Sequence, residues 1–116
     1  MGPFLDGWTT ADVEAAIARD DPDEVLFAPI VVSLDPPNCE WAESVCVRLA
    51  AHRDERVRAN ALLGFGHLAR TCGRLNAAVV LPLVVAGKAD LSPLVRGHAE
   101  SAADDLESYL GWSVTG

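Results

Sequence analysis

The stretch that decides the fold is Asp54-Glu55-Arg56-Val57-Arg58-Ala59-Asn60-Ala61, and a similar stretch begins 38 residues later as Ser92-Pro93-Leu94-Val95-Arg96-Gly97-His98-Ala99. In each copy, a residue that caps helices is followed three and four positions later by Val-Arg and seven positions later by Ala. A repeat of this length whose units read as helix pairs is the mark of a helical solenoid. Such arrays usually bind other macromolecules, and so the repeat favours binding over chemistry.

The composition fits one helical domain. The chain has 116 residues, of which 50% are hydrophobic, and Ala, Val and Leu outnumber the aromatic residues. This predicts a single all-α domain over 1–116. No apolar run approaches the ~20 residues that cross a bilayer, and the opening MGPFLDGW lacks the basic start of a signal peptide. We therefore expect a cytoplasmic protein that does not associate with membranes.

Capping residues and chain breakers divide the chain into about six helices, paired as three hairpins. The first hairpin, 9–34, is the least regular. Its second helix is predicted to begin after Asp21, with Glu24 closing a capping box. Pro29 is expected to kink that helix or end its first turns, because proline lacks the backbone N–H that a helix interior needs.

The rest of the chain gives two repeat units, at about 38–73 and 76–110. Asp54 is predicted to cap the second helix of the first unit, and Gly73 to end it. Gly87 is expected to end the first helix of the second unit in the same way. No β-hairpin signal competes with this helical interpretation.

The repeated stretch also resembles a known family. The pattern Asp54-x-x-Val57-Arg58-x-x-Ala61, with Ser92-x-x-Val95-Arg96-x-x-Ala99 behind it, is similar to the second helix of HEAT-type repeats. The Leu81-Pro82-Leu83 turn in the preceding helix is also typical of these repeats. The resemblance implies a short HEAT-like helical-repeat solenoid, in which the second helices line a concave surface.

Two further strings are similar to small bacterial single-domain HEAT-like proteins: Trp41-Ala42-Glu43-Ser44 and Gly66-His67-Leu68-Ala69-Arg70. Some of those proteins are thought to be immunity proteins of polymorphic toxin systems. The resemblance also implies that Arg58 and Arg96, which occupy equivalent places, brace neighbouring turns through an acidic partner. Arginine suits that role because its planar fork holds two acceptors at once.

Charge is distributed unevenly along the chain. Segment 1–47 holds ten acidic residues and one basic residue, 48–88 holds seven basic and two acidic, and 89–116 holds five acidic and one basic. The overall net charge of −8 disfavours nonspecific nucleic-acid binding, which needs a large basic footprint. It suits a protein partner with a basic surface, such as a toxin.

Two sets of residues are candidates for contact with that partner. The first, called here the groove row, shares one face of the second helices of the two repeat units. Its members are Arg56, Asn60, His67, Arg70, Arg74, His98 and Asp105. The second, called here the acidic face, consists of Asp20, Asp21, Asp23 and Glu24. Capping explains much of the acidic face, and a solvated helix face is the alternative explanation of the groove row.

The glycine-rich stretch Gly64-Phe65-Gly66-His67-Leu68-Ala69 matches a dinucleotide-binding pattern only by letter. That fingerprint needs a strand before it, whereas the predicted helix from Asp54 places both glycines in mid-helix. Because mid-helix glycine costs up to ~1 kcal/mol against alanine, we expect a neighbouring helix to approach closely there. No cofactor is predicted.

Nothing in the chain predicts an enzyme. The three histidines have no metal-ligand spacing, so no metal site is expected, and no serine or cysteine is arranged for nucleophilic catalysis. An odd number of cysteines without a C-x-x-C predicts reduced thiols rather than disulfides. These are Cys39, Cys46 and Cys72.

The favoured function is non-catalytic protein binding, with neutralisation of a cognate toxin as its concrete form. A small adaptor or assembly subunit that stacks through its exposed ends is the alternative. Nucleic-acid recognition by the basic middle segment is a third, which the net charge of −8 disfavours. Trp8, Trp41 and Trp112 are expected to cover the ends of the core, with anchoring of a partner as the alternative role.

Overall fold

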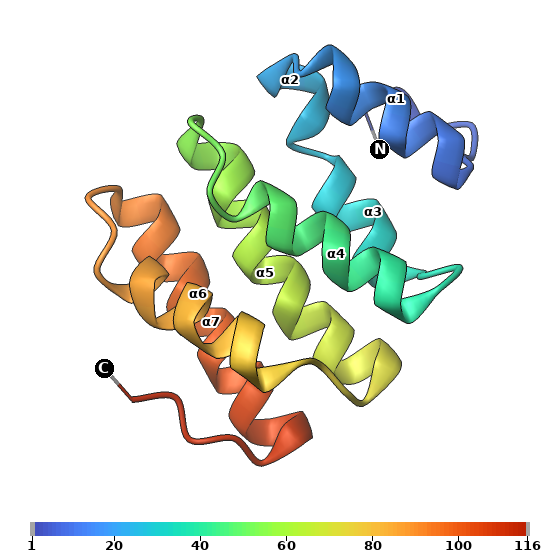
Figure 1. Cartoon of the computed structure of the whole chain (residues 1–116). Helices are drawn as coiled ribbons and strands as arrows, with labels where there is room; N and C mark the ends of the chain where they lie inside the picture. The colour runs from blue at the N-terminus through green and yellow to red at the C-terminus, as the bar shows by residue number, and fades with distance from the viewer. Residues whose placement is uncertain (1, 116) are drawn as a thin grey trace.

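The computed structural model describes residues 2–115, and that part of the chain is built from helices with no β-strand (Figure 1). The elements are the 3-10 turn η1 (Gly2–Phe4) and the helices α1 (Thr10–Arg19), α2 (Pro22–Val25), α3 (Ala28–Leu34), α4 (Cys39–Leu49), α5 (Glu55–Cys72), α6 (Ala77–Lys88) and α7 (Pro93–Leu110). The predicted all-α class is confirmed.

The N-terminal helices follow their caps, with two differences from the prediction. The capping box belongs to α1, where the Thr9 hydroxyl accepts from the backbone N–H of Asp12 at 3.2 Å and the Asp12 carboxylate accepts from Thr9 at 2.8 Å. Asp21 caps α2, but the capping box expected there is wrong, because the Glu24 carboxylate accepts from Arg19 instead. The helix expected after Asp21 also divides into α2 and α3, with Pro29 in the first turn of α3. A proline is tolerated there because the N–H it lacks would have no helical partner.

The later helices begin and end largely as predicted. Asp54 caps α5, and Gly73 and Gly111 end α5 and α7 in the left-handed conformation that favours glycine. Gly87 does not end α6, which continues to Lys88. Gly87 instead lies buried inside the helix, where an added methyl group would meet the side chain of Leu62.

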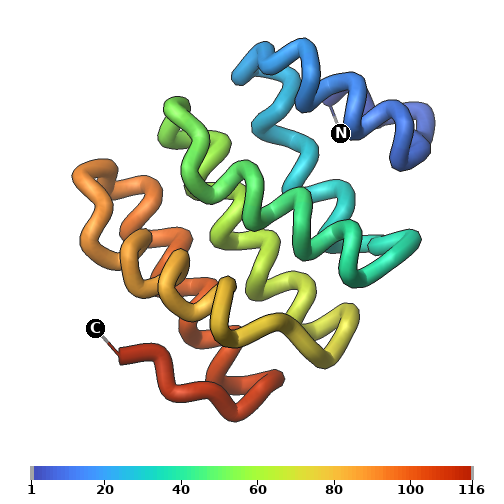
Figure 2. The backbone as a smooth tube through the Cα atoms, in the orientation of Figure 1, coloured from blue at the N-terminus to red at the C-terminus, as the bar shows by residue number. Residues whose placement is uncertain are grey.

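Helices α3, α5 and α7 pack side by side in chain order, with α4 against α5 and α6 against α7 (Figure 1). The order in space follows the order in sequence from one end of the molecule to the other (Figure 2). Helix α5 is central, because it packs on α3 and α4 on one side and, most extensively, on α7 on the other. Its fully buried Phe65 and Leu68 belong to the same core as Leu106 of α7.

Both chain ends fold back onto this core. Phe4 of η1 is buried, and Trp8 stacks on Trp41 of α4 with ring centroids 6.2 Å apart. After α7, the chain continues through Trp112, which packs against the core, to the buried Val114. All three tryptophans therefore contact the core, as expected of residues that cover its ends.

Candidate functional site

The acidic face lies at the loop between α1 and α2, and basic side chains of the next hairpin surround it. His52 Nε2 donates to Asp20 at 2.6 Å, because its Nδ1 already accepts from the backbone N–H of Asp54 at 3.0 Å. Arg53 also pairs with the Asp20 carboxylate and donates to its backbone carbonyl at 3.1 Å. Hydrogen bonds from His52 and then Arg53 lower the pKa of Asp20 below its ordinary value.

The other acidic-face carboxylates are also engaged. Asp23 pairs with Arg56 at 2.8 Å, Glu24 pairs with Arg19 at 3.0 Å, and Asp21 caps α2. The negative charge of the acidic face is thus largely compensated within the chain. The uneven charge along the sequence reflects this pairing, since a base of the middle segment meets an acid of the first.

A further pair of this kind joins α4 to α1. Arg48 donates to both oxygens of Glu14, at 2.8 and 2.9 Å, and the Trp41 indole N–H donates to the same carboxylate at 3.0 Å. Led by the Arg48 hydrogen bond, these contacts lower the pKa of Glu14 to about 2. The pair fixes the first hairpin to the second.

The first members of the groove row are committed to contacts within the protein. Arg56 pairs with Asp23 and with Asp54 at 3.1 Å, and its hydrogen bond lowers the pKa of Asp54 to about 2. Asn60 donates its side-chain N–H to the backbone carbonyl of Leu26 at 2.8 Å. Both residues join α5 to the region of α2.

His67 lies in the middle of the row and contacts a buried serine. Its Nδ1 is 3.1 Å from Ser33 Oγ, and the Ser33 hydroxyl donates to the carbonyl of Ile30 at 3.1 Å. His67 therefore donates its Nδ1–H to Ser33, which leaves Nε2 unprotonated. Burial, followed by the charge of Arg70, lowers the pKa of the imidazole. Although a serine, a histidine and the nearby Asp105 invite comparison with a catalytic triad, Ser33 is fully buried and its proton is used on Ile30.

Asp105 of α7 lies directly against Gly66 of α5. A methyl group added at Gly66 would lie 2.6 Å from Asp105 Oδ2, so only glycine leaves room for this carboxylate. Gly64, two residues earlier, faces the other way, and a methyl group added there would lie 2.6 Å from Cys46 Sγ. The close approach of neighbouring helices that was predicted for these two glycines is confirmed, and they form no phosphate-binding turn.

At the seam between α5 and α7, the groove row remains open to solvent. Arg70 is exposed and His98 is half-buried, and neither forms an ion pair with any residue of 2–115. Arg70 and Asp105 are close enough for their charges to act in opposite directions on the pKa of His67. His67, Arg70 and Asp105 therefore form a compact patch with both signs of charge.

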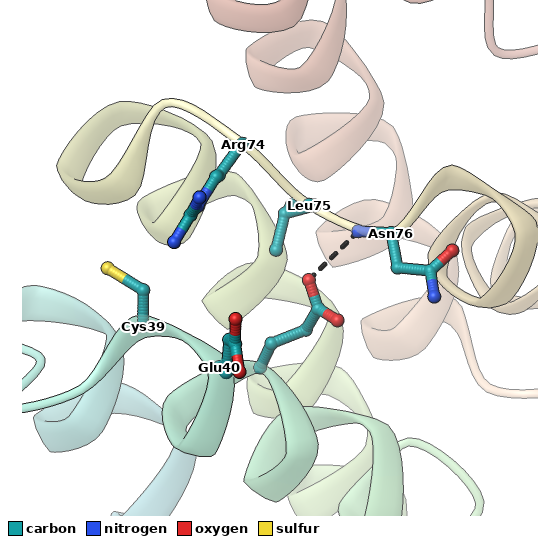
Figure 3. Close-up of a pocket in the computed structure, with 6 residues that line it drawn as sticks. Cys39, Glu40, Arg74, Leu75 and Asn76 are labelled. Carbon is teal, nitrogen blue, oxygen red and sulfur yellow. Dashed lines mark hydrogen bonds between the residues drawn. The ribbon is translucent and has the colours of Figure 1, made fainter.

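Arg74 lies beyond the end of α5, in a shallow hollow of about 410 Å³. The Arg74 and Leu75 side chains point from the loop toward α4, where Glu40 lies (Figure 3). The loop is held by the backbone N–H of Asn76, which donates to Glu43 Oε1 at 2.9 Å. The hollow therefore separates Arg74 from the α5–α7 seam and gives it acidic neighbours.

One edge of this hollow is a disulfide that the sequence did not reveal. Cys39, the first residue of α4, is bonded to Cys72, the last residue of α5, with Cα atoms 6.0 Å apart. The prediction of three reduced thiols is wrong for this pair, because the fold brings together residues 33 apart in sequence. Cys46 is free and fully buried, as predicted, and burial raises the pKa of its thiol.

Arg58 and Arg96 occupy matching positions in the structure as well as in the sequence. Arg58 donates Nη1 to the carbonyls of the residues five and six positions earlier, at 3.1 Å each. Arg96 does the same, at 2.7 and 3.1 Å. Arg58 also donates Nε and Nη2 to the two oxygens of Asp90, both at 3.1 Å. The expectation that both arginines brace neighbouring turns through an acidic partner is confirmed for Arg58 and wrong for Arg96, which forms no ion pair with any residue of 2–115.

Sequence reasoning passed over one group of acids on α7. Glu100, Asp104 and Glu107 are exposed along one side of the helix and form no ion pair with any residue of 2–115. Aligning the two copies of the repeat would have revealed them, since Glu100 and Asp104 stand where the first copy has the buried Leu62 and Gly66.

Comparison with protein-family models, with curated proteins and with solved structures found no match. Within residues 2–115, no helix is long and apolar enough to cross a membrane. The same residues contain no group of three or more His, Cys, Asp or Glu side chains placed to hold a metal ion. Any statement of function therefore depends on the surfaces described above.

Proposed function

We propose that this protein is a non-catalytic protein-binding module, built as a short HEAT-like stack of helical hairpins. The observation that carries the proposal is the patch of His67, Arg70 and Asp105 at the α5–α7 seam. Arg70 stays exposed and forms no ion pair with any residue of 2–115, although most other arginines of the chain are paired internally. The tight contact of Asp105 with Gly66 gives the patch a fixed shape.

Repeat geometry supports the HEAT-like part of the proposal. The arginines of the two units hold the same backbone carbonyls, counted from their own positions, and the second helices α5 and α7 pack against each other. A helical stack of this kind presents a broad surface for macromolecules rather than an enclosed site for chemistry. The burial of Ser33, the hydroxyl nearest to a histidine, also favours binding over catalysis.

Neutralisation of a toxin is the concrete form of binding that we favour. A single-domain protein with a net charge of −8 suits a basic partner, which it would attract at long range. The adaptor alternative is less favoured, because the core is covered at one end by Phe4 and Trp8 and at the other by Trp112 and Val114. A subunit that stacks through its ends needs exposed apolar surface there.

We infer a cytoplasmic location, and this gives the Cys39–Cys72 bond a testable meaning. Cytoplasmic glutathione and thioredoxin keep most thiols reduced, so the working form there would be the dithiol. In an oxidising compartment the bond would persist. Alkylating thiols in intact cells before lysis, followed by mass spectrometry of the two cysteine peptides, separates the two cases.

The test of the binding proposal is affinity capture from lysate of the source cells at low and moderate salt, read by mass spectrometry. We expect one basic protein at equal stoichiometry, captured less well as salt rises. The variant Arg70→Glu should lose it, and Asp23→Lys, on the acidic face, is the matched control. Retention by the first and loss by the second would move the contact to the acidic face. Recovery of nucleic acid alone, or of a large assembly with no effect of salt, would contradict the proposal.

A further inference from the structure

The arginine of the second repeat unit has one side of its guanidinium group unused. Arg58 binds two backbone carbonyls with Nη1 and a carboxylate, that of Asp90, with Nε and Nη2. Arg96 binds the matching carbonyls with Nη1, whereas its Nε and Nη2 donate to no atom of residues 2–115. Glu100, one turn later on α7, forms no ion pair with it in that part of the chain. Arg96 is thus held in the orientation in which Arg58 receives a carboxylate.

Beside Arg96 lies the most exposed large hydrophobic side chain among the described residues. Leu91 is 96% exposed, and its backbone carbonyl is one of the two acceptors that hold Arg96. The matching residue of the first unit is Arg53, which pairs with Asp20 of the preceding loop. An exposed leucine next to an oriented arginine combines the apolar and polar contacts that interface centres use.

The adjoining side of α7 decides what kind of partner fits. On α5, the side that meets the third hairpin includes Leu62 and Gly66, both buried. The matching residues of α7 are Glu100 and Asp104, which are charged. A further apolar hairpin or a second copy of the stack would bury these carboxylates without partners, at a prohibitive cost. A free acidic peptide would be repelled by them, so the partner must carry bases as well as an acid.

We propose that Arg96 and Leu91 form a docking point for a loop of a partner protein that presents one Asp or Glu next to Lys or Arg. The partner's carboxylate takes the place at Arg96 that Asp90 takes at Arg58, and its bases face Glu100 and Asp104. The inference rests on the proposed function, because it names a second surface by which a binding module holds its partner. This second surface lies at the α6–α7 loop and is separate from the patch at the α5–α7 seam.

The chain supplies a probe for this docking point. The peptide acetyl-Lys-Ala-Asp-Leu-Ser-Pro-amide copies residues 88–93, which contain the carboxylate that Arg58 receives. It would be titrated into protein labelled with 13C and 15N, with the arginine Nε–Hε and leucine methyl signals followed by NMR. The control peptide has Asn in place of Asp. The protein variants are Arg96→Ala and, as a matched control, Arg74→Ala, which removes an exposed arginine from the loop between α5 and α6.

We expect saturable shifts of the Arg96 Nε–Hε and Leu91 methyl signals. The affinity should fall about tenfold with the Asn peptide or with Arg96→Ala, which is the usual worth of a charge-assisted hydrogen-bonded pair. Arg74→Ala should behave as wild type. Equal shifts with both peptides, shifts centred on Arg70, or no shift at millimolar peptide would overturn the inference.

The two proposals fail separately. A partner captured from lysate equally by the wild type and by Arg96→Ala would keep the binding function and refute this docking point. Peptide binding at Arg96 without capture of any protein would keep the carboxylate site and refute the binding function.

Discussion

Reducing the Cys39–Cys72 bond should lower the stability of the fold by a predictable amount. The bond joins the start of α4 to the end of α5 and closes a loop of 33 residues. Chain-entropy arguments assign a loop of this length a stabilisation of about 3.7 kcal/mol at 25 °C, because the unfolded chain loses freedom when its ends are joined. A domain of 116 residues has an unfolding entropy of about 0.24 kcal/mol/K, so the midpoint should fall by about 15 °C.

The assay is thermal unfolding followed by circular dichroism, with and without a phosphine reductant. The double variant Cys39→Ser/Cys72→Ser should unfold near the reduced wild type, and the reductant should not change it further. Since both cysteines are only half-buried, the substitutions themselves should add little. A shift of less than about 4 °C, which corresponds to about 1 kcal/mol, would refute the reasoning. It would mean that the unfolded chain without the bond keeps residual structure between its α4 and α5 segments, so that closing the loop removes little of its freedom.

Three further predictions concern glycine, arginine and histidine. Gly66→Ala should destabilise the fold by about 1 kcal/mol, because the new methyl group would press on the side chain of Asp105. Gly97→Ala should instead stabilise the fold by about 0.5–1 kcal/mol, because Gly97 is helical and has open space around it. Both changes are measured by denaturant titration. Arg58→Ala should lower the free energy of unfolding by about 2 kcal/mol, measured in the same way, because it removes the two hydrogen bonds that the guanidinium group donates to the Asp90 carboxylate. Arg58→Lys should recover only part of this loss, because an ammonium group cannot donate to both oxygens in the same way. The pKa of His67 is lowered in the folded protein, so the unfolded chain binds more protons at this residue. The free energy of unfolding should therefore fall as the pH drops below about 6.5. The variant His67→Gln should show a weaker pH dependence of stability between about pH 7.5 and 5.

Local signals in the sequence were sufficient to locate most helices. The side chains of Asn38, Asp54 and Ser92 cap α4, α5 and α7, since capping depends on bonds within a few residues. Gly87 was misjudged because its neighbours along the chain allow a stop. The glycine is needed there for another reason, since it leaves space for Leu62, which comes from a different hairpin.

Long-range pairing explains what the sequence left hidden at the candidate surfaces. The acidic face was recognised as acidic, but the arginines that neutralise it, Arg53 and Arg56, lie 33 residues away in sequence from their partners. The Cys39–Cys72 pair was missed for the same reason. The unused side of Arg96 could be seen only once Arg58 was found holding Asp90. The numbers of charges and cysteines do not show which residues of the chain pair with each other, whereas the alignment of the two repeat units does.

The disulfide also has a mechanical consequence. A pull on the two ends of the chain passes from Cys39 directly to Cys72 through the covalent bond, and the residues between them carry no tension. At ~3.5 Å per extended residue, this withholds about 110 Å of contour length from the stretched chain. The α4–α5 hairpin, which forms the middle of the stack, would therefore be shielded from force while the hairpins on either side are drawn out.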